Sequence, residues 1–147
     1  MSIIQTKWSE EQCPIEYGIF FSNDECILLE GQPEDGYAAS ARVLVSSLTE
    51  VDEDDGWVHL YRNPSCQIEE NGFIVLGGET SWEGDGFVAV IEAASRSLVW
   101  IMHLYRSEKF LEINLDAENI QAVSAEYPHS YHWKIPLSKP EMLKVVC

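Results

Sequence analysis

The chain has 147 residues, a length typical of one domain, and 46% of them are hydrophobic, which excludes a disordered polypeptide. Its formal net charge is −16, and no apolar run approaches the ~20 residues that a membrane-spanning helix needs. Residues 1–92 hold most of the acidic side chains, whereas residues 93–147 are nearly neutral. Phosphate contacts need clustered Lys and Arg, so this charge disfavours nucleic acid and favours a basic protein as partner.

Most of the chain is predicted to form short β-strands, because apolar runs rich in β-branched and aromatic residues alternate with turn residues. The first two runs, residues 18–21 and 26–30, flank a turn at 22–25 and predict a hairpin. The gaps at 93–97 and 116–118 also suit antiparallel hairpins. The later strand-like runs are 57–62, 73–76, 87–92, 98–104, 110–115, 119–125, 130–137 and 142–146.

One segment, residues 34–48, is predicted to be a helix. It follows Gln32-Pro33, and its apolar side chains recur at helical spacing. The alternation of Val43 and Val45 allows a strand instead. The apolar positions on the helical face are Tyr37, Ala41, Leu44, Val45 and Leu48.

Residues 87–104 and 120–137 align without gaps as a weak internal repeat, in which Trp100 corresponds to Trp133. Each copy is predicted to be a strand, a turn and a second strand that carries the Trp. The pair resembles two blade-like hairpins of a quinoprotein-type β-propeller, but 147 residues are too few for four blades of four strands. We therefore interpret the repeat as a hairpin used twice in an antiparallel meander. Residues 98–104 are apolar on both faces, which predicts a central strand.

Together these elements predict a single domain, residues 1–147, of the α+β class. The expected architecture is an antiparallel β-sheet meander of about six to nine strands with one packed helix. An all-β fold is the alternative if residues 34–48 form a strand.

The stretch 50–57, EVDEDDGW, has a density of carboxylates that suits a metal ion. A calcium-binding EF-hand loop needs Gly at position 6, oxygen ligands at positions 1, 3 and 5, and Glu at position 12. Aligning Gly56 with position 6 places Val51 at position 1 and Arg62 at position 12. The register fails, and we predict no metal and no cofactor.

No motif in the chain specifies a reaction, because GxSxG, CxxC, P-loop and GxGxxG patterns are all absent. His59 and His103 lie within predicted strands, where a structural histidine is the more common outcome. With no CxxC and no secretion signal, reduced thiols are expected. The sequence therefore predicts no catalytic residue, and an enzyme site assembled from distant residues is the alternative. The cysteines are Cys13, Cys26, Cys66 and Cys147.

Two segments, residues 50–57 and 77–87, combine clustered acids with a Trp. Such a pair suits a basic protein surface, because the aromatic ring supplies buried contact and the carboxylates supply steering and charged hydrogen bonds. The alternatives are that Trp57 and Trp82 belong to the core and that the acids only maintain solubility. The predicted partner-binding residues are Glu50, Asp52, Glu53, Asp54, Asp55, Trp57, Glu79, Trp82, Glu83 and Asp85.

In its size, acidity and lack of a catalytic motif, the whole chain resembles bacterial immunity proteins of contact-dependent inhibition systems, although no motif carries the resemblance. The resemblance implies a cytoplasmic bacterial protein that neutralises a cognate toxin, often a basic nuclease domain, by occluding its active site. The expectation is therefore a non-enzymatic, protein-binding inhibitor. A small enzyme and an acidic adaptor or structural subunit are the alternatives.

Overall fold

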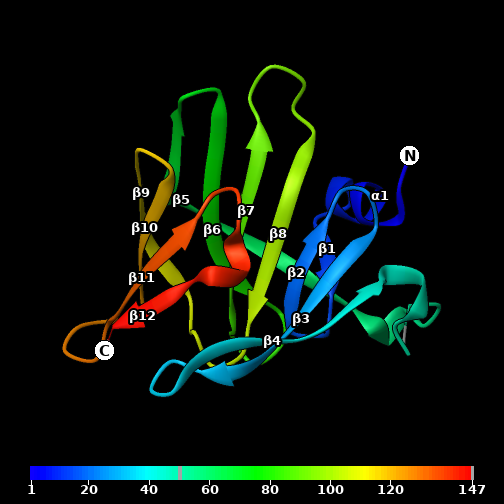
Figure 1. Ribbon diagram of the computed structural model, residues 1–147, viewed down its shortest axis with the longest axis horizontal. Coiled ribbons are helices and arrows are strands. Elements are labelled where there is room, and N and C mark those ends of the chain that lie inside the picture. Colours follow the sequence, from blue (N-terminus) through cyan, green and yellow to red (C-terminus); the bar gives the residue numbers. More distant parts are fainter. Residues whose placement is uncertain (50, 147) are drawn as a thin grey trace.

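The computed structural model describes residues 1–49 and 51–146, so Glu50 and Cys147 lie outside the description. Within these residues, two antiparallel sheets of eight and four strands are accompanied by one α-helix and three short 3₁₀ turns (Figure 1). The prediction of an antiparallel α+β fold with one packed helix is confirmed, with more strands than expected. In this part of the chain, no helix combines the length and apolar character needed to cross a membrane.

The large sheet contains, in spatial order, β1 (Gln12–Pro14), β5 (Trp57–Glu70), β6 (Phe73–Thr80), β7 (Gly86–Glu92), β8 (Leu98–Leu104), β2 (Gly18–Phe21), β3 (Glu25–Gln32) and β4 (Gly36–Leu44). The small sheet contains β12 (Lys144–Val146), β11 (Tyr131–Pro136), β10 (Asn119–Ser124) and β9 (Phe110–Asp116). Helix α1 spans Ile3–Ser9, and the 3₁₀ turns are η1 (Val45–Ser47), η2 (Asp54–Gly56) and η3 (Pro140–Met142).

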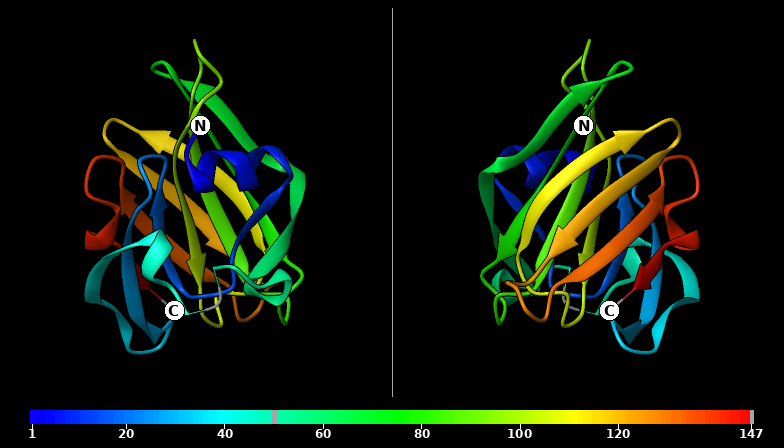
Figure 2. Two further views of the ribbon diagram at one scale, coloured as in Figure 1. Left: turned by 90° about the vertical axis from the view of Figure 1, so that its right-hand side faces the viewer. Right: turned by 90° about the vertical axis from the view of Figure 1, so that its left-hand side faces the viewer.

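Strands β7 and β8 lie in the middle of the large sheet and are buried on both faces. On one face, Ala89 and Ile101 pack into a cluster with the α1 residues Ile4 and Trp8. On the other face, Met102 packs into a second cluster with residues of the small sheet. Figure 2 shows α1 and the small sheet on opposite sides of the large sheet. The two-sided burial predicted for residues 98–104 is confirmed.

Helix α1 is held in place by a side chain from a distant turn. Ser2 caps the helix by accepting a hydrogen bond from Gln5 N, and the Asp24 carboxylate accepts from Ile3 N at 3.0 Å and Ile4 N at 2.9 Å. These acceptors satisfy three of the N–H groups that a helix start leaves unpaired. Because Asp24 belongs to the β2–β3 turn, the cap fixes the helix to the large sheet.

The prediction of a helix over residues 34–48 is wrong. Residues 36–44 form β4, which pairs with β3 from Glu25↔Leu44 to Gln32↔Gly36, and only η1 follows. A short helix with the same apolar positions could cover one face of the sheet, whereas strand pairing satisfies the backbone groups along the whole of β3. Tertiary pairing therefore overrides a helical pattern that also fitted a strand. The α-helix of this fold lies at residues 3–9 instead.

The internal repeat corresponds to two hairpins, β7–β8 and β10–β11, as predicted. They belong to different sheets rather than to one meander. Trp100 pairs with Val90 in the first hairpin, and Trp133 pairs with Ala122 in the second. Both indoles are 1% exposed and lie in the cluster between the sheets. The repeated hairpins therefore face each other across the core.

The sandwich of the two sheets has two open ends, which we name by a residue at each. The Trp82 end carries the connections at residues 81–85, 105–109 and 125–130, and it lies at the bottom of Figure 1. The Phe73 end carries the β5–β6, β7–β8 and β9–β10 turns and lies at the top.

Replacing Asp24 by Ala should lower the free energy of unfolding by about 1–2 kcal/mol, because two amides at the start of α1 lose their acceptor. Asp24 has a φ of 70°, so Asp24→Asn is the control that tolerates this backbone and retains one acceptor oxygen. Urea unfolding of both variants measures the difference. An Ala variant as stable as wild type would contradict the capping role.

Candidate functional site

The turn between β6 and β7 presents Trp82 at the surface. The Trp82 side chain is 42% exposed, whereas Asp85 is 5% exposed. Asp85 N donates to Trp82 O at 3.1 Å, and Thr80 N donates to Asp85 O at 2.7 Å. Trp82 N also donates to the Thr80 hydroxyl at 3.3 Å. These bonds fix the backbone of the turn from which the exposed indole projects.

The buried Asp85 carboxylate links three segments of the Trp82 end. One oxygen accepts from the Tyr17 hydroxyl at 2.6 Å, and the other accepts from Arg106 N at 2.9 Å. Burial, followed by the Asp85 carboxylate, raises the pKa of Tyr17, and the phenol therefore stays a donor. The sequence placed Asp85 on a partner-binding surface, and its burial corrects that prediction because the carboxylate serves the structure of the turn.

Aromatic rings gather beside this turn. Tyr17 lies in an edge-to-face contact with Tyr105 at a centroid distance of 5.2 Å, and the Tyr17 hydroxyl also interacts with the Trp82 side chain. Tyr105 is 40% exposed. Trp82 and Tyr105 thus form an exposed aromatic surface supported from below by Tyr17.

Next to the aromatic surface, an acidic cleft of about 480 Å³ opens between the two sheets. Its lining includes one lysine, Lys109, which pairs with Glu126 at 3.2 Å, and one histidine, His129. Among residues 1–49 and 51–146, no ion pair engages the three other glutamates. The cleft therefore offers unpaired carboxylates to a cation. The glutamates that line it are Glu79, Glu83, Glu108 and Glu126.

The acids of the other predicted segment lie outside this cleft. Asp52, Glu53, Asp54 and Asp55 are exposed on the connection that leads through η2 into β5. The strand that follows is bonded to the Trp82 turn, because Ser81 N donates to His59 O and His59 N donates to Ser81 Oγ, both at 2.9 Å. The two predicted segments are therefore neighbours but do not share a cleft. Glu50 lies outside the described residues.

Trp57 is part of the core, which removes it from the candidate contact surface. The side chain is 8% exposed, and its indole donates to Val51 O at 3.1 Å. The Lys7 ammonium lies over the ring at 5.0 Å from the centroid. Trp57 packs with Ile4 and Trp8 of α1, so the core interpretation of this residue is the right one.

Several residues of the site were not found by sequence reasoning. Glu108, Glu126 and His129 line the cleft, and Tyr105 lies beside it. They come from the β8–β9 and β10–β11 connections, which the sandwich brings to the β6–β7 turn. No local motif marks them, because their proximity depends on the packing of the two sheets.

His103 does not provide an accessible catalytic group. Its ring is 0% exposed, and its nitrogens lie 3.3 Å from Thr80 Oγ1 and 3.2 Å from the carbonyl oxygens of Pro14 and Glu16. All of its hydrogen-bonding capacity is thus used within the protein. His59, in contrast, is exposed on β5.

The three cysteine thiols within the described residues are equally inaccessible. Cys13, Cys26 and Cys66 are free and buried. Burial raises the pKa of Cys26 and of Cys66 to about 12, which disfavours the reactive thiolate. Within the described residues, no group of three or more His, Cys, Asp or Glu side chains is arranged to hold a metal ion.

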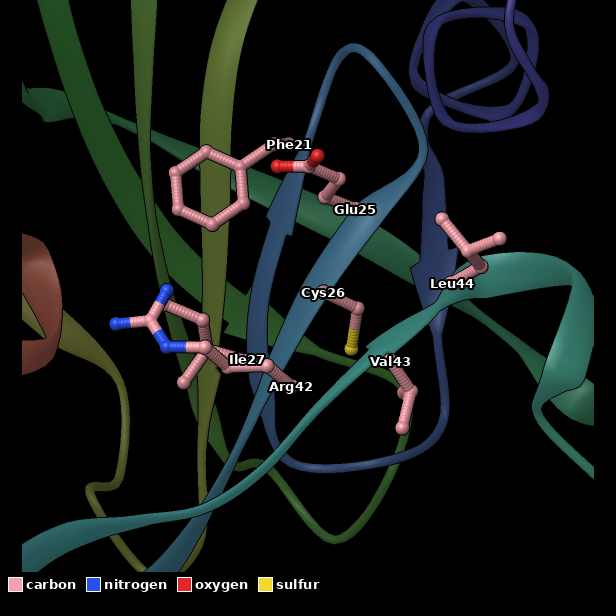
Figure 3. Close-up of a pocket in the computed structure, with 7 residues that line it drawn as sticks. All are labelled: Phe21, Glu25, Cys26, Ile27, Arg42, Val43 and Leu44. Atoms are coloured by element: carbon pink, nitrogen blue, oxygen red, sulfur yellow. The ribbon is translucent and has the colours of Figure 1, made fainter.

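A further cleft of about 300 Å³ lies over β2, β3 and β4 (Figure 3). Phe21, Ile27 and Arg42 lie on one side of the strands, whereas Cys26 and Val43 lie on the other. The Arg42 guanidinium is bonded to Glu141 at 2.7 Å. Its charge is therefore already paired, and this cleft is mixed in character rather than acidic.

The fold and this site define a two-sheet antiparallel sandwich with an acidic, aromatic end. Comparison with protein-family models, with curated proteins and with solved structures finds no match to this chain.

Protonation of His103 should destabilise the fold. Burial lowers the pKa of His103, despite the opposing effect of Asp85, so the folded state keeps the ring neutral. The unfolded chain has a histidine pKa of about 6.5. The contribution of the neutral His103 ring to the free energy of unfolding is therefore complete above this pKa. It is lost as the pH falls towards the lower pKa of the folded state.

Urea unfolding at about pH 7.5 and about pH 5.5 tests this prediction, with an expected loss of about 1 kcal/mol at the lower pH. The variant His103→Gln should show a smaller loss between these two pH values. The variant His59→Gln is the exposed control and should retain the wild-type pH dependence. Equal pH dependence in wild type and His103→Gln would disprove the assignment.

Proposed function

We propose that the protein is an acidic, protein-binding inhibitor that neutralises a basic partner, in the manner of an immunity protein acting on a toxin. The observation that carries the proposal is the exposed Trp82, on a turn closed by its own hydrogen bonds, beside a cleft with unpaired glutamates. An exposed Trp is a common anchor of protein interfaces, and carboxylates suit the Lys and Arg side chains of a basic surface.

Two features of the Trp82 end support tight binding. The turn that carries Trp82 is closed by its own hydrogen bonds, so little conformational freedom is lost when a partner covers it. The cleft lies between the sheets, where a cation entering it would exchange water for carboxylates. An Arg or Lys of the partner would fill the cleft while Trp82 and Tyr105 bury apolar surface beside it.

The exposed acids at residues 52–55 have a different part in this proposal. They are exposed and lie outside the cleft, so their contribution is long-range attraction rather than contact. They would increase the rate of encounter with a basic partner. Trp57, which is buried, has no part in binding.

In this mechanism the inhibitor acts by occlusion. A nuclease or another enzyme of anionic substrates uses basic residues around its active site, and those residues match the glutamates of the cleft. Engaging them would cover the active site and exclude the substrate. An adaptor subunit would use the same surface without blocking the activity of its partner, so an activity assay distinguishes the two functions.

Removing the anchor or the cleft charges should weaken partner binding. Trp82→Ala should raise the dissociation constant about thirtyfold, a loss of ~2 kcal/mol. Glu79→Gln combined with Glu83→Gln should raise it about tenfold. The matched control, Glu69→Gln with Glu70→Gln, removes the same charge from exposed positions at the Phe73 end and should bind like wild type.

The partner is first captured from extracts of the native host with the wild-type protein and then purified. Its affinity for each variant is measured by calorimetry, and its enzymatic activity is assayed with and without the wild-type protein. Inhibition supports the proposal. A partner that binds but keeps its activity would make the protein an adaptor, and unchanged affinity of Trp82→Ala would move the interface elsewhere.

Neutralising the acids of the connection that leads into β5 should lower the rate of association with the partner and leave the rate of dissociation unchanged. The variant replaces Asp52, Glu53, Asp54 and Asp55 together by Asn or Gln. We expect slower association with the purified partner and a weaker dependence of that rate on salt, because attraction between exposed charges is screened. Stopped-flow mixing at several salt concentrations measures both. Wild-type rates in this variant would exclude a steering role.

A further inference from the structure

A second cleft opens between the sheets at the Phe73 end, opposite to the acidic cleft. It measures about 600 Å³, compared with about 480 Å³ for the acidic cleft. This volume lies within the range of pockets that hold small organic molecules. The walls are apolar and are formed by Phe73, Val90, Val99, Ala117 and Leu137.

The walls of this apolar cleft are held by one hydrogen bond within the small sheet and one between the two sheets. Leu137 N donates to Glu118 O at 2.8 Å, and Leu137 O accepts from the Trp100 indole at 3.1 Å. Trp100 comes from the large sheet, whereas Glu118 belongs to the turn between β9 and β10. Leu137 is thereby held from both sides, so this wall of the cleft needs little ordering when a ligand binds.

The rim of the cleft carries polar groups available to a ligand. Asn71, Glu118 and Ser138 line the cleft and are exposed. A carboxylate only accepts hydrogen bonds, whereas an amide and a hydroxyl can donate and accept. Glu118 contributes the charge among the lining residues, and the whole chain has a net charge of −16. Both features favour a ligand with a positive, hydrogen-donating group.

We propose that this cleft binds a small amphiphilic amine. Its apolar body would lie between Phe73, Val99 and Leu137, and its protonated amine would lie at the rim beside Glu118. A second copy of the chain is a poorer occupant, because two molecules of charge −16 repel each other. The site is independent of the proposed inhibitor function, which uses the opposite end of the sandwich.

Three probes with the same octyl chain test the proposal: octylammonium and octanoate, each below its micelle concentration, and octanol below its solubility limit. Binding is followed by the indole N–H signals in nuclear magnetic resonance spectra of the protein labelled with ¹⁵N. The Trp100 signal should move, because its acceptor Leu137 lines the cleft, whereas the Trp82 signal should not. Octylammonium should bind best, octanol second and octanoate worst.

Glu118→Gln should reduce the preference for octylammonium over octanol by about two- to fivefold, as expected for a partly exposed ion pair. Val99→Trp should fill the apolar cleft and weaken the binding of all three probes. The matched control is Leu44→Trp, which places the same ring at an exposed position in the cleft of Figure 3 and should leave binding unchanged.

Three results would overturn the proposal. The first is a Trp100 signal that no probe moves, and the second is octanoate binding as well as octylammonium. The third is a concentration-dependent dimer in sedimentation velocity that Val99→Trp dissociates, which would assign the cleft to a second copy of the chain. Spectra of Val99→Trp and Leu44→Trp without probe establish that both variants are folded.

Discussion

The structure depends on one constraint, that strands β7 and β8 are apolar on both faces. A sheet whose central strands have two apolar faces must be covered twice. The amino-terminal helix, with Ile4 and Trp8, contributes to the cover on one side, and the small sheet covers the other. Acidic side chains are therefore excluded from these two strands, apart from the exposed Glu92 that ends β7. Both clefts between the sheets lie at the open ends that this double cover leaves.

At the Trp82 end, the burial of a single carboxylate determines the local structure. Taking Asp85 out of water is unfavourable, and hydrogen bonds from Tyr17 and Arg106 N offset that cost. The close approach of the β8–β9 loop also explains the neighbouring Gly86, since a Cβ there would lie 2.2 Å from Glu108 O. Glycine and buried acid together bring the β8–β9 loop against the Trp82 turn, and this contact places Glu108 in the acidic cleft.

The strands and the repeated hairpins could be predicted because their signals are local. Trp100 and Trp133 mark equivalent positions in two hairpins, and both rings lie in the core. The helix prediction for residues 34–48 is wrong because the spacing of their apolar residues, several of them alanine, also fits a helix. The pairing of β4 with β3 decides that the segment is a strand. The amino-terminal helix left a weak signal, because it has seven residues and part of its cap comes from Asp24.

In the candidate site, too, the features that depend on residues distant in the sequence could not be predicted. An exposed Trp82 and a buried Trp57 have similar acidic neighbourhoods in the sequence, yet their exposures are 42% and 8%. Trp57 opens a strand under α1, whereas Trp82 sits on a turn beyond the strand end. Glu108 and Glu126 could not be assigned at all, because their place beside Glu79 depends on how two sheets stack.

The exposed acids at residues 52–55 lie apart from Trp82 and its cleft, and this separation would affect how a basic partner binds. Carboxylates that stay exposed attract from a distance and need not lose their water, so they raise the association rate at little energetic cost. Carboxylates in a cleft must be desolvated and repay that cost only when a donor of the right shape enters. Residues 52–55 fit the first role, and Glu79, which is partly buried in the cleft, fits the second. Acidity alone would therefore recruit many cations, and the discrimination among them would come from the cleft and from Trp82.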